Sequence, residues 1–201
     1  MIEVDTVSTP RPAMTPPLAL LLVAIGRYLE RARLQEVRDG ISELEIQKLA
    51  YFLQTLGAPL RLTFVRGRYG PYSDQLAHVL DSLGGHYLSG YGGRSARVPE
   101  LVPINLTDGA LDEAQAELDR HPQDNDRVSA LCAMADGFET PYSLELLATV
   151  HFAASQEPAT ADPDVLSDRV AGWGLRKARL FTEEHVHLAA RRLAEHGLLA
   201  T

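Results

Sequence analysis

The chain has 201 residues, 45% of them hydrophobic, and a formal net charge of −8. A chain of this length buries about 70% of the surface that it exposes when unfolded, so a core forms without cross-links. The longest apolar run, residues 18–25, is far shorter than the roughly 20 residues of a membrane-spanning helix. The single cysteine, Cys132, excludes an internal disulfide. We therefore expect a cytoplasmic protein that makes no contact with membranes.

The charge is distributed unevenly. Residues 100–168 contain 15 acidic residues against two arginines, Arg120 and Arg127, which gives this stretch a net charge of −13. An acidic surface repels nucleic-acid phosphates and attracts basic proteins. The sequence thus predicts a basic protein partner and no tight binding of nucleic acid.

Residues 1–17 are rich in proline and small polar residues, which is typical of a linker or an added tail. A first helix is expected to begin after Thr15 and to run to about Ala32. A second follows a capping box formed by Ser42 and Glu45 and ends at Gly57. Residues 60–66 alternate weakly and predict a strand. Glycine and proline predict irregular structure in the loop 66–72.

Ser73 is expected to cap a third helix, and residues 86–91 and 98–104 are expected to form further strands. Later helices are predicted after Thr107, over about 126–135, and after Thr140, Asp162 and Thr182. The fold class is therefore mainly α (α+β). It is a helical domain, over residues 18–201, with a small β-sheet or hairpin between the second and third helices and after the third.

The pattern offers weak catalytic candidates. Cys132 lies on the expected apolar helix face with Val128 and Leu131, which favours a small buried side chain. His185 and His187 are two residues apart and do not have the four-residue spacing of a helical zinc pair. We therefore predict no catalytic site, no cofactor and no metal, and expect the chain not to be an enzyme.

The segment 66–97 interleaves arginines with tyrosines. Such a pattern permits stacking of single-stranded bases, while the competing interpretation is that the tyrosines pack the loop internally. The aromatic and basic residues are Arg66, Arg68, Tyr69, Tyr72, Tyr87, Tyr91, Arg94 and Arg97.

Several segments, in the same order along most of the chain, resemble the C-terminal domain of DarG-type antitoxins. They are residues 45–54, 57–62, 64–72, 84–87, 90–92 and 140–151, with Trp173, Lys177 and the ending at Gly197. The resemblance implies an antitoxin domain that neutralises DarT, a toxin that ADP-ribosylates DNA. In such antitoxins a separate macrodomain removes the ADP-ribose. This chain has no room for a macrodomain, so we expect it to be a fragment of a longer protein.

The resemblance and the charge pattern together suggest acidic mimicry of single-stranded DNA in the groove of the toxin. Asp108 with Asp112, and Glu113 with Glu117, have the four-residue spacing that aligns carboxylates on a helix. The alternative is a single-stranded nucleic-acid-binding module that uses the Tyr/Arg loop. The expected toxin-binding residues are Asp108, Asp112, Glu113, Glu117, Asp119, Arg68, Tyr69, Tyr72 and Tyr91.

Overall fold

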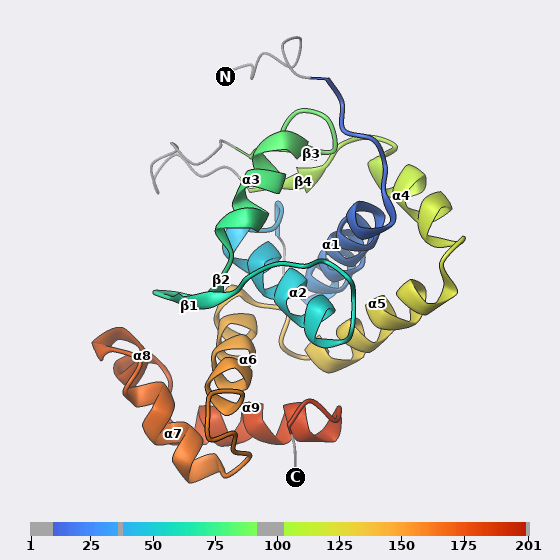
Figure 1. The fold of residues 1–201 in the computed structure, drawn as a ribbon. Helices are drawn as coiled ribbons and strands as arrows, with labels where there is room; N and C mark the ends of the chain where they lie inside the picture. The colour runs from blue at the N-terminus through green and yellow to red at the C-terminus, as the bar shows by residue number, and fades with distance from the viewer. Residues whose placement is uncertain (1–9, 36–37, 92–102, 200–201) are drawn as a thin grey trace. The chain divides into compact units, whose positions relative to one another are not determined.

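The computed structural model describes residues 10–35, 38–91 and 103–199, and it is mostly helical (Figure 1). These residues form two compact units. The first falls within Met1–Phe64 and Ser73–Ala133, and the second within Val65–Tyr72 and Met134–Thr201. The expected mainly α fold is confirmed. Within the described residues no helix is long and apolar enough to cross a bilayer.

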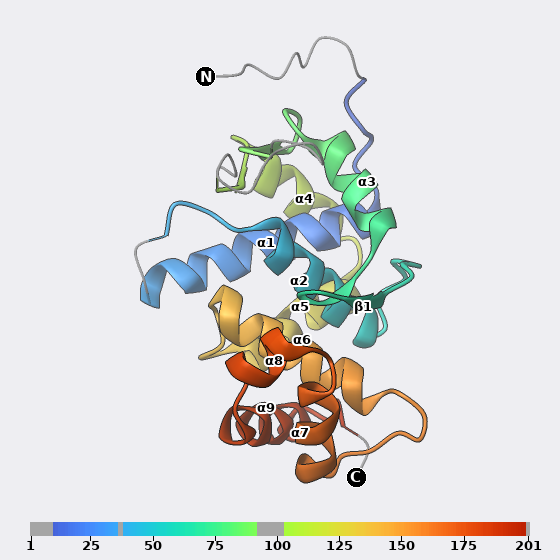
Figure 2. The ribbon, with the colours of Figure 1, turned by 90° about the vertical axis from the view of Figure 1, so that its left-hand side faces the viewer.

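The first unit is built around the apolar helix α1 (Pro16–Gln35), which packs against α2 (Glu43–Thr55) and α4 (Ala110–Leu118) (Figure 2). The remaining elements of this unit are α3 (Asp74–Leu83), β3 (Leu88–Ser89), β4 (Asn105–Leu106) and α5 (Pro122–Ala135). Strands β3 and β4 pair antiparallel, with Leu88 opposite Leu106. The core of the unit includes the fully buried side chains of Leu22 and Phe52.

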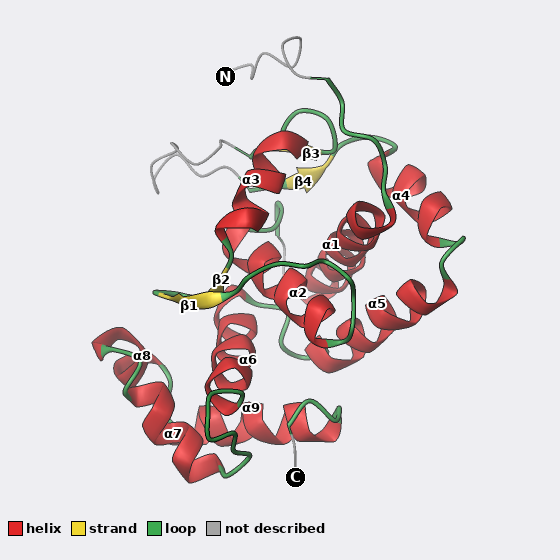
Figure 3. Cartoon of the chain, viewed as in Figure 1, coloured by secondary structure: helices red, strands yellow, loops and turns green. Residues whose placement is uncertain are grey.

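The second unit combines a short hairpin with four helices (Figure 3). Its elements are β1 (Val65–Gly67), β2 (Gly70–Tyr72), α6 (Pro141–Ala154), α7 (Pro163–Ala171), α8 (Leu175–Leu180) and α9 (Glu183–Glu195). Helix α6 contacts α7, α9 and β2, and α7 also contacts α8 and α9. The buried face of α9 is formed by Val186, Ala189, Ala190 and Leu193, as its helical spacing predicts.

Most of the expected helix starts are confirmed by hydrogen bonds. Ser42 accepts from the backbone of Glu45 while the Glu45 carboxylate accepts from Ser42, which is the predicted capping box. Thr140, Asp162 and Thr182 cap α6, α7 and α9 with their side chains. Ser73 occupies the N-cap position of α3 but makes no capping hydrogen bond there.

The expected β structure is partly wrong. Residues 60–64 form no strand, because the Gln54 side chain takes both backbone groups of Leu62: its amide donates to the carbonyl at 2.8 Å and its oxygen accepts from the N–H at 2.7 Å. The expected irregular loop 66–72 is instead the β1–β2 hairpin. Pro71 is tolerated there because a two-stranded sheet leaves one side of each strand unpaired. The expected strand 98–104 lies mostly outside the described residues.

Candidate functional site

The tip of the β1–β2 hairpin carries two of the residues singled out in the sequence, Arg68 and Tyr69. Gly67 pairs with Gly70 on either side of them. Gly70 has a φ of 91°, and a Cβ at Gly67 would lie 2.9 Å from the Gly70 carbonyl oxygen. Both glycines are therefore needed for a turn this tight, because other residues resist the positive φ or the close backbone approach.

Trp173, in the turn between α7 and α8, fixes the hairpin to the helices of the second unit. Its indole N–H donates to the Gly67 carbonyl at 2.9 Å. The Arg66 guanidinium lies 4.8 Å from the centre of the Trp173 ring and donates to the Gly172 carbonyl at 2.8 Å. These contacts hold an exposed arginine against an aromatic ring, which is the geometry of a cation–π interaction.

Helix α8 adds further basic side chains to this region. The Arg176 guanidinium lies 4.6 Å from the centre of the Tyr69 ring, and that of Arg68 lies 5.4 Å from it. Arg179 follows Arg176 by one helical turn, and the two line an open pocket with Leu175 and Leu180. We call this region the basic aromatic face, defined by Arg66, Arg68, Tyr69, Trp173, Arg176 and Arg179.

A buried ion pair lies beneath this face. Glu145 of α6 accepts hydrogen bonds from Arg176 at 2.5 and 3.2 Å, and from the Lys177 ammonium at 2.5 Å. Lys177 also donates to the Thr149 hydroxyl at 2.9 Å, and its side chain is only 1% exposed. The buried Glu145 carboxylate thereby holds the Arg176 guanidinium in place, while the Arg176 side chain remains about one-third exposed.

The environment of the ion pair changes the pKa of both partners. Burial alone would raise the pKa of Glu145, but the hydrogen bonds from Arg176 and Lys177 outweigh burial and lower it. Burial lowers the pKa of Lys177 to about 8, although Glu145 opposes this shift. Glu145 is therefore ionised at neutral pH, and its lone pairs are already used by two cations.

The acidic residues expected to imitate DNA lie in the first unit, in and around α4. Asp108, Asp112 and Asp119 are exposed. Asp119 also accepts from the Gln115 amide at 2.7 Å. The other two acids form ion pairs: Glu113 accepts from Arg11 at 2.5 Å, and Glu117 accepts from Arg120 at 2.7 Å. Helical spacing in the sequence predicts that Leu111, Ala114 and Leu118 face inward on α4. Ala114 and Leu118 are buried together with Ala110, whereas Leu111 is 39% exposed, so this prediction is wrong for Leu111.

The Tyr/Arg segment does not form one surface. Arg66, Arg68, Tyr69 and Tyr72 belong to the second unit, whereas Tyr87 and Tyr91 belong to the first, where both are buried. The Tyr87 hydroxyl donates to the Pro12 carbonyl at 2.8 Å. The interpretation as internal packing is thus confirmed for these two tyrosines. Arg94 and Arg97 fall outside the described residues.

The remaining candidates are placed as follows. Cys132 is half-buried beside the buried Val128 and Leu131, so the expected burial of its side chain is only partial. His185 Nδ1 lies 2.7 Å from the Tyr142 hydroxyl, which makes His185 part of a local hydrogen bond. Burial lowers the pKa of His151 to about 4, opposed by a hydrogen bond to the backbone of Leu198. Because His151 follows an apolar segment in the sequence, a position in the core or at its edge is expected, and the lowered pKa agrees with such a position.

The sequence pattern did not indicate that Trp173, Arg176 and Glu145 belong to one site. The available signal was local: α8 has three basic residues and no acidic ones in six positions. The hydrogen-bond partners of Trp173 and Arg176 could not be predicted from residue spacing. Trp173 donates to a carbonyl 106 positions earlier in the chain, and Arg176 donates to a carboxylate 31 positions earlier.

Comparison with known proteins gives three relatives that share one name. No protein-family profile matches the sequence. The chain is 40% identical over 189 residues to a DNA ADP-ribosyl glycohydrolase of Thermus aquaticus, covering 94% of this chain and 49% of the relative. It is 38% identical over 187 residues to proteins of the same name from Mycobacterium bovis and Mycobacterium tuberculosis, covering 90% of this chain and 53% of each relative. The chain therefore spans about half the length of the curated relatives it matches.

These names correct the functional expectations. The relatives matched over at least 90% of this chain are named for an enzymatic activity, DNA ADP-ribosyl glycohydrolase. The interpretation as a non-enzymatic DarG-type antitoxin domain that neutralises DarT is overturned by them, and so is the alternative of a single-stranded nucleic-acid-binding module. The first rested on a resemblance of several segments to one domain of such antitoxins, supported by the acidic stretch, and the second rested on the interleaved tyrosines and arginines; neither observation identifies a reaction. The expected connection with DNA ADP-ribosylation agrees with the name of these relatives.

Proposed function

We propose that this protein acts in the removal of ADP-ribose from DNA, as a DNA ADP-ribosyl glycohydrolase. The observation that carries the proposal is the match, at 38–40% identity, to three proteins of that name over at least 90% of this chain. Because the chain spans about half of each relative, the proposal concerns the protein to which these residues belong.

The basic aromatic face is suited to the substrate of such an enzyme. ADP-ribose carries a diphosphate and an adenine ring, and DNA adds further phosphates. Guanidinium groups bind phosphate through paired N–H donors, and aromatic rings stack on bases. Arg68 and Arg179 are exposed, and the guanidinium groups of Arg68 and Arg176 both lie close to the Tyr69 ring. We propose that this face binds the anionic part of the substrate.

We assign Glu145 a positioning role in this scheme. A general acid or base must reach the reacting atoms and have a free site for the proton. The Glu145 carboxylate is already bonded to Arg176 and Lys177, and the Lys177 ammonium is buried with it. The ion pair therefore sets the orientation of Arg176 beside Tyr69, and through it the shape of the basic aromatic face.

The test measures release of ADP-ribose from modified DNA by the full-length protein that contains this chain. The double variant R68A/R179A should raise the KM at least tenfold, since one lost charged hydrogen bond alone is worth roughly 1.5–3 kcal/mol and a factor of ten corresponds to about 1.4 kcal/mol. The matched control is R191A, which removes an exposed arginine of α9 outside the face.

The possible outcomes separate the two parts of the proposal. Absence of any ADP-ribose release by the full-length protein would contradict the glycohydrolase function. Normal activity with an unchanged KM in R68A/R179A would retain the function and contradict the role of the basic aromatic face. A KM raised equally by R191A would attribute the effect to net charge alone.

A further inference from the structure

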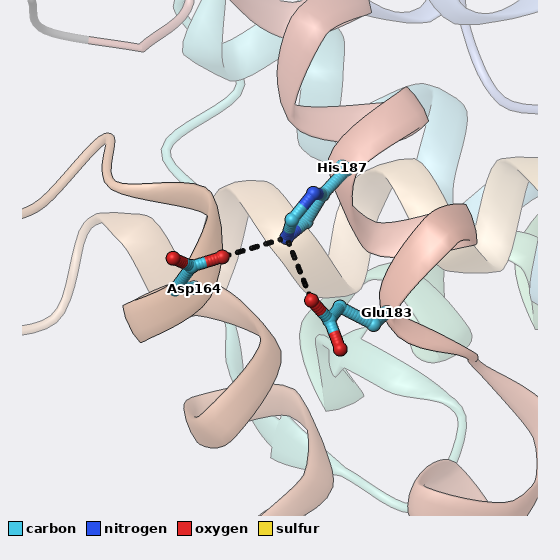
Figure 4. A group of neighbouring side chains, drawn as sticks. All are labelled: Asp164, Glu183 and His187. Carbon is cyan, nitrogen blue, oxygen red and sulfur yellow. Dashed lines mark ion pairs between the residues drawn. The ribbon is translucent and has the colours of Figure 1, made fainter.

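A mixed group of one imidazole and two carboxylates lies where α7 and α9 pack against each other in the second unit. Asp164 is the second residue of α7, Glu183 is the first residue of α9, and His187 follows Glu183 by one helical turn. Contact between the two helices brings Asp164 next to a pair that α9 alone already aligns (Figure 4). None of these residues belongs to the basic aromatic face.

The ring nitrogen of His187 points at both carboxylates (Figure 4). Its Nε2 lies 3.2 Å from Asp164 Oδ1 and 3.9 Å from Glu183 Oε1. One ligand atom from each residue lies within 4.8 Å of the other two. In a tetrahedral zinc site with bonds of 2.0–2.2 Å, ligand atoms are about 3.4 Å apart. Small rotations of the exposed carboxylates are therefore enough to place three ligands around one ion.

The surroundings of the His187 Nε2 atom also favour a bound cation. It is shielded from solvent and makes no hydrogen bond within the described part of the chain, although two carboxylates lie close to it. This nitrogen has lost water, and within the described residues its near neighbours are the two carboxylates, which form ion pairs with it only when the imidazole is protonated. A cation between Nε2 and the two carboxylates satisfies the nitrogen and offsets the repulsion between the carboxylates.

We propose that Asp164, Glu183 and His187 bind a divalent transition-metal ion, with Zn²⁺ as the best fit. The imidazole favours Zn²⁺ and its neighbours in the periodic table over Mg²⁺ and Ca²⁺, which prefer sites made only of oxygen. Three protein ligands leave at least one coordination position for water. The carboxylate side chains are 82% and 74% exposed, so the ion enters directly from solvent.

The site ties α7 to α9, since its ligands come from both helices. Binding should therefore stabilise the folded second unit by mass action. The competing explanation is that Asp164 and Glu183 only favour the first turns of their own helices, where acidic side chains are stabilising. That explanation predicts no zinc binding and no dependence of zinc binding on His187.

The experiment titrates ZnCl₂ into the untagged, chelator-treated chain in competition with a chromophoric zinc indicator, and follows thermal unfolding in parallel. We expect one tight site per chain and a rise in Tm on zinc addition. The variants H187A and D164N should each weaken this site at least tenfold and reduce the Tm shift. The matched control E184Q removes a neighbouring exposed acid of α9 and should bind zinc like the unchanged chain.

Three results would overturn the proposal. The first is no zinc binding by the unchanged chain at 100-fold excess over a micromolar indicator. The second is equal zinc affinity in H187A and the unchanged chain, which would place the ion elsewhere. The third is that E184Q and D164N weaken zinc binding equally, which would show that the acidic surface attracts zinc without a specific site. Because H187A and D164N alter surface positions, their circular dichroism spectra should match that of the unchanged chain.

Discussion

The two units each bury a glutamate near the start of a helix, and they satisfy it in different ways. Glu45 of the first unit accepts from Ser42 three residues away and from Arg38, and the Tyr28 hydroxyl donates to it at 2.8 Å. Glu145 of the second unit instead depends on two cations of α8, more than 30 positions later in the chain.

The difference shows where stability depends on local sequence and where it depends on packing. Glu45 completes a capping box, which forms as soon as α2 forms. Glu145 is satisfied only once α8 has docked onto α6. Arg38 is 13% exposed and retains access to water, whereas Lys177 is 1% exposed. Removing the glutamate carboxylate should therefore lower the free energy of unfolding more in the second unit than in the first.

The largest expected effect comes from Glu145→Gln. It leaves the Lys177 ammonium buried without its counter-ion, and breaking such a pair costs about 3 kcal/mol. Glu45→Gln should cost about half as much, because the amide still bonds to its neighbours and Arg38 reaches water. Urea unfolding followed by tryptophan fluorescence reports on the second unit, since Trp173 is the single tryptophan of the chain.

The control for this comparison is the double variant E145Q/K177M, which removes both buried charges. It should recover most of the stability lost in Glu145→Gln, because the unpaired ammonium is gone. If the double variant is as unstable as Glu145→Gln, the stability of the second unit depends on packing of the Lys177 hydrocarbon chain and not on its charge.

A smaller effect is expected from acid through His151. Burial lowers its pKa from 6.5 to about 4. The unfolded chain therefore binds more protons between these values, so stability falls as the pH falls from about 6.5 to 4. The loss should be on the order of 2 kcal/mol, after allowance for the part of the ring that water reaches. Unfolding curves over this range should be flatter with pH in His151→Gln.

The matched control for the acid effect is His196→Gln, which alters the histidine at the C-cap of α9. An equal flattening in both variants would attribute the effect to the overall charge of the second unit and not to burial of His151.

A third comparison uses the two capping boxes. Ser42→Ala in the first unit and Thr140→Ala in the second each remove a side-chain acceptor from a helix start, with an expected cost of about 1 kcal/mol. Loss of far-UV circular dichroism on heating measures both. Equal costs would confirm that local capping contributes similarly in the two units, whereas a much larger cost in one would show that its cap is coupled to packing.

The smallest expected effect is at Ser73, which occupies an N-cap position but whose buried hydroxyl finds no hydrogen-bond partner among the residues that the structure describes. Ser73→Ala removes a group that has lost water without gaining a bond, so stability should stay the same or rise slightly. The same thermal measurement provides the contrast with Ser42→Ala. A loss of about 1 kcal/mol at Ser73 would mean that its hydroxyl acts as a cap in solution.

The sequence by itself predicted the helical class and most helix starts. Ser42, Thr140, Asp162 and Thr182 bond to backbone groups within three residues, so their signals are contained in short segments. The buried face of α9 follows from the sequence for the same reason, because helical spacing is a local property.

Only the tertiary structure decided the rest. The β1–β2 hairpin needed the close approach of Gly67 to Gly70, and residues 60–64 lost their strand to the side chain of Gln54. The basic aromatic face and the group of Asp164, Glu183 and His187 join positions that are far apart in the chain. Long-range contacts of this kind leave no fixed spacing in a sequence, because they depend on how whole elements pack.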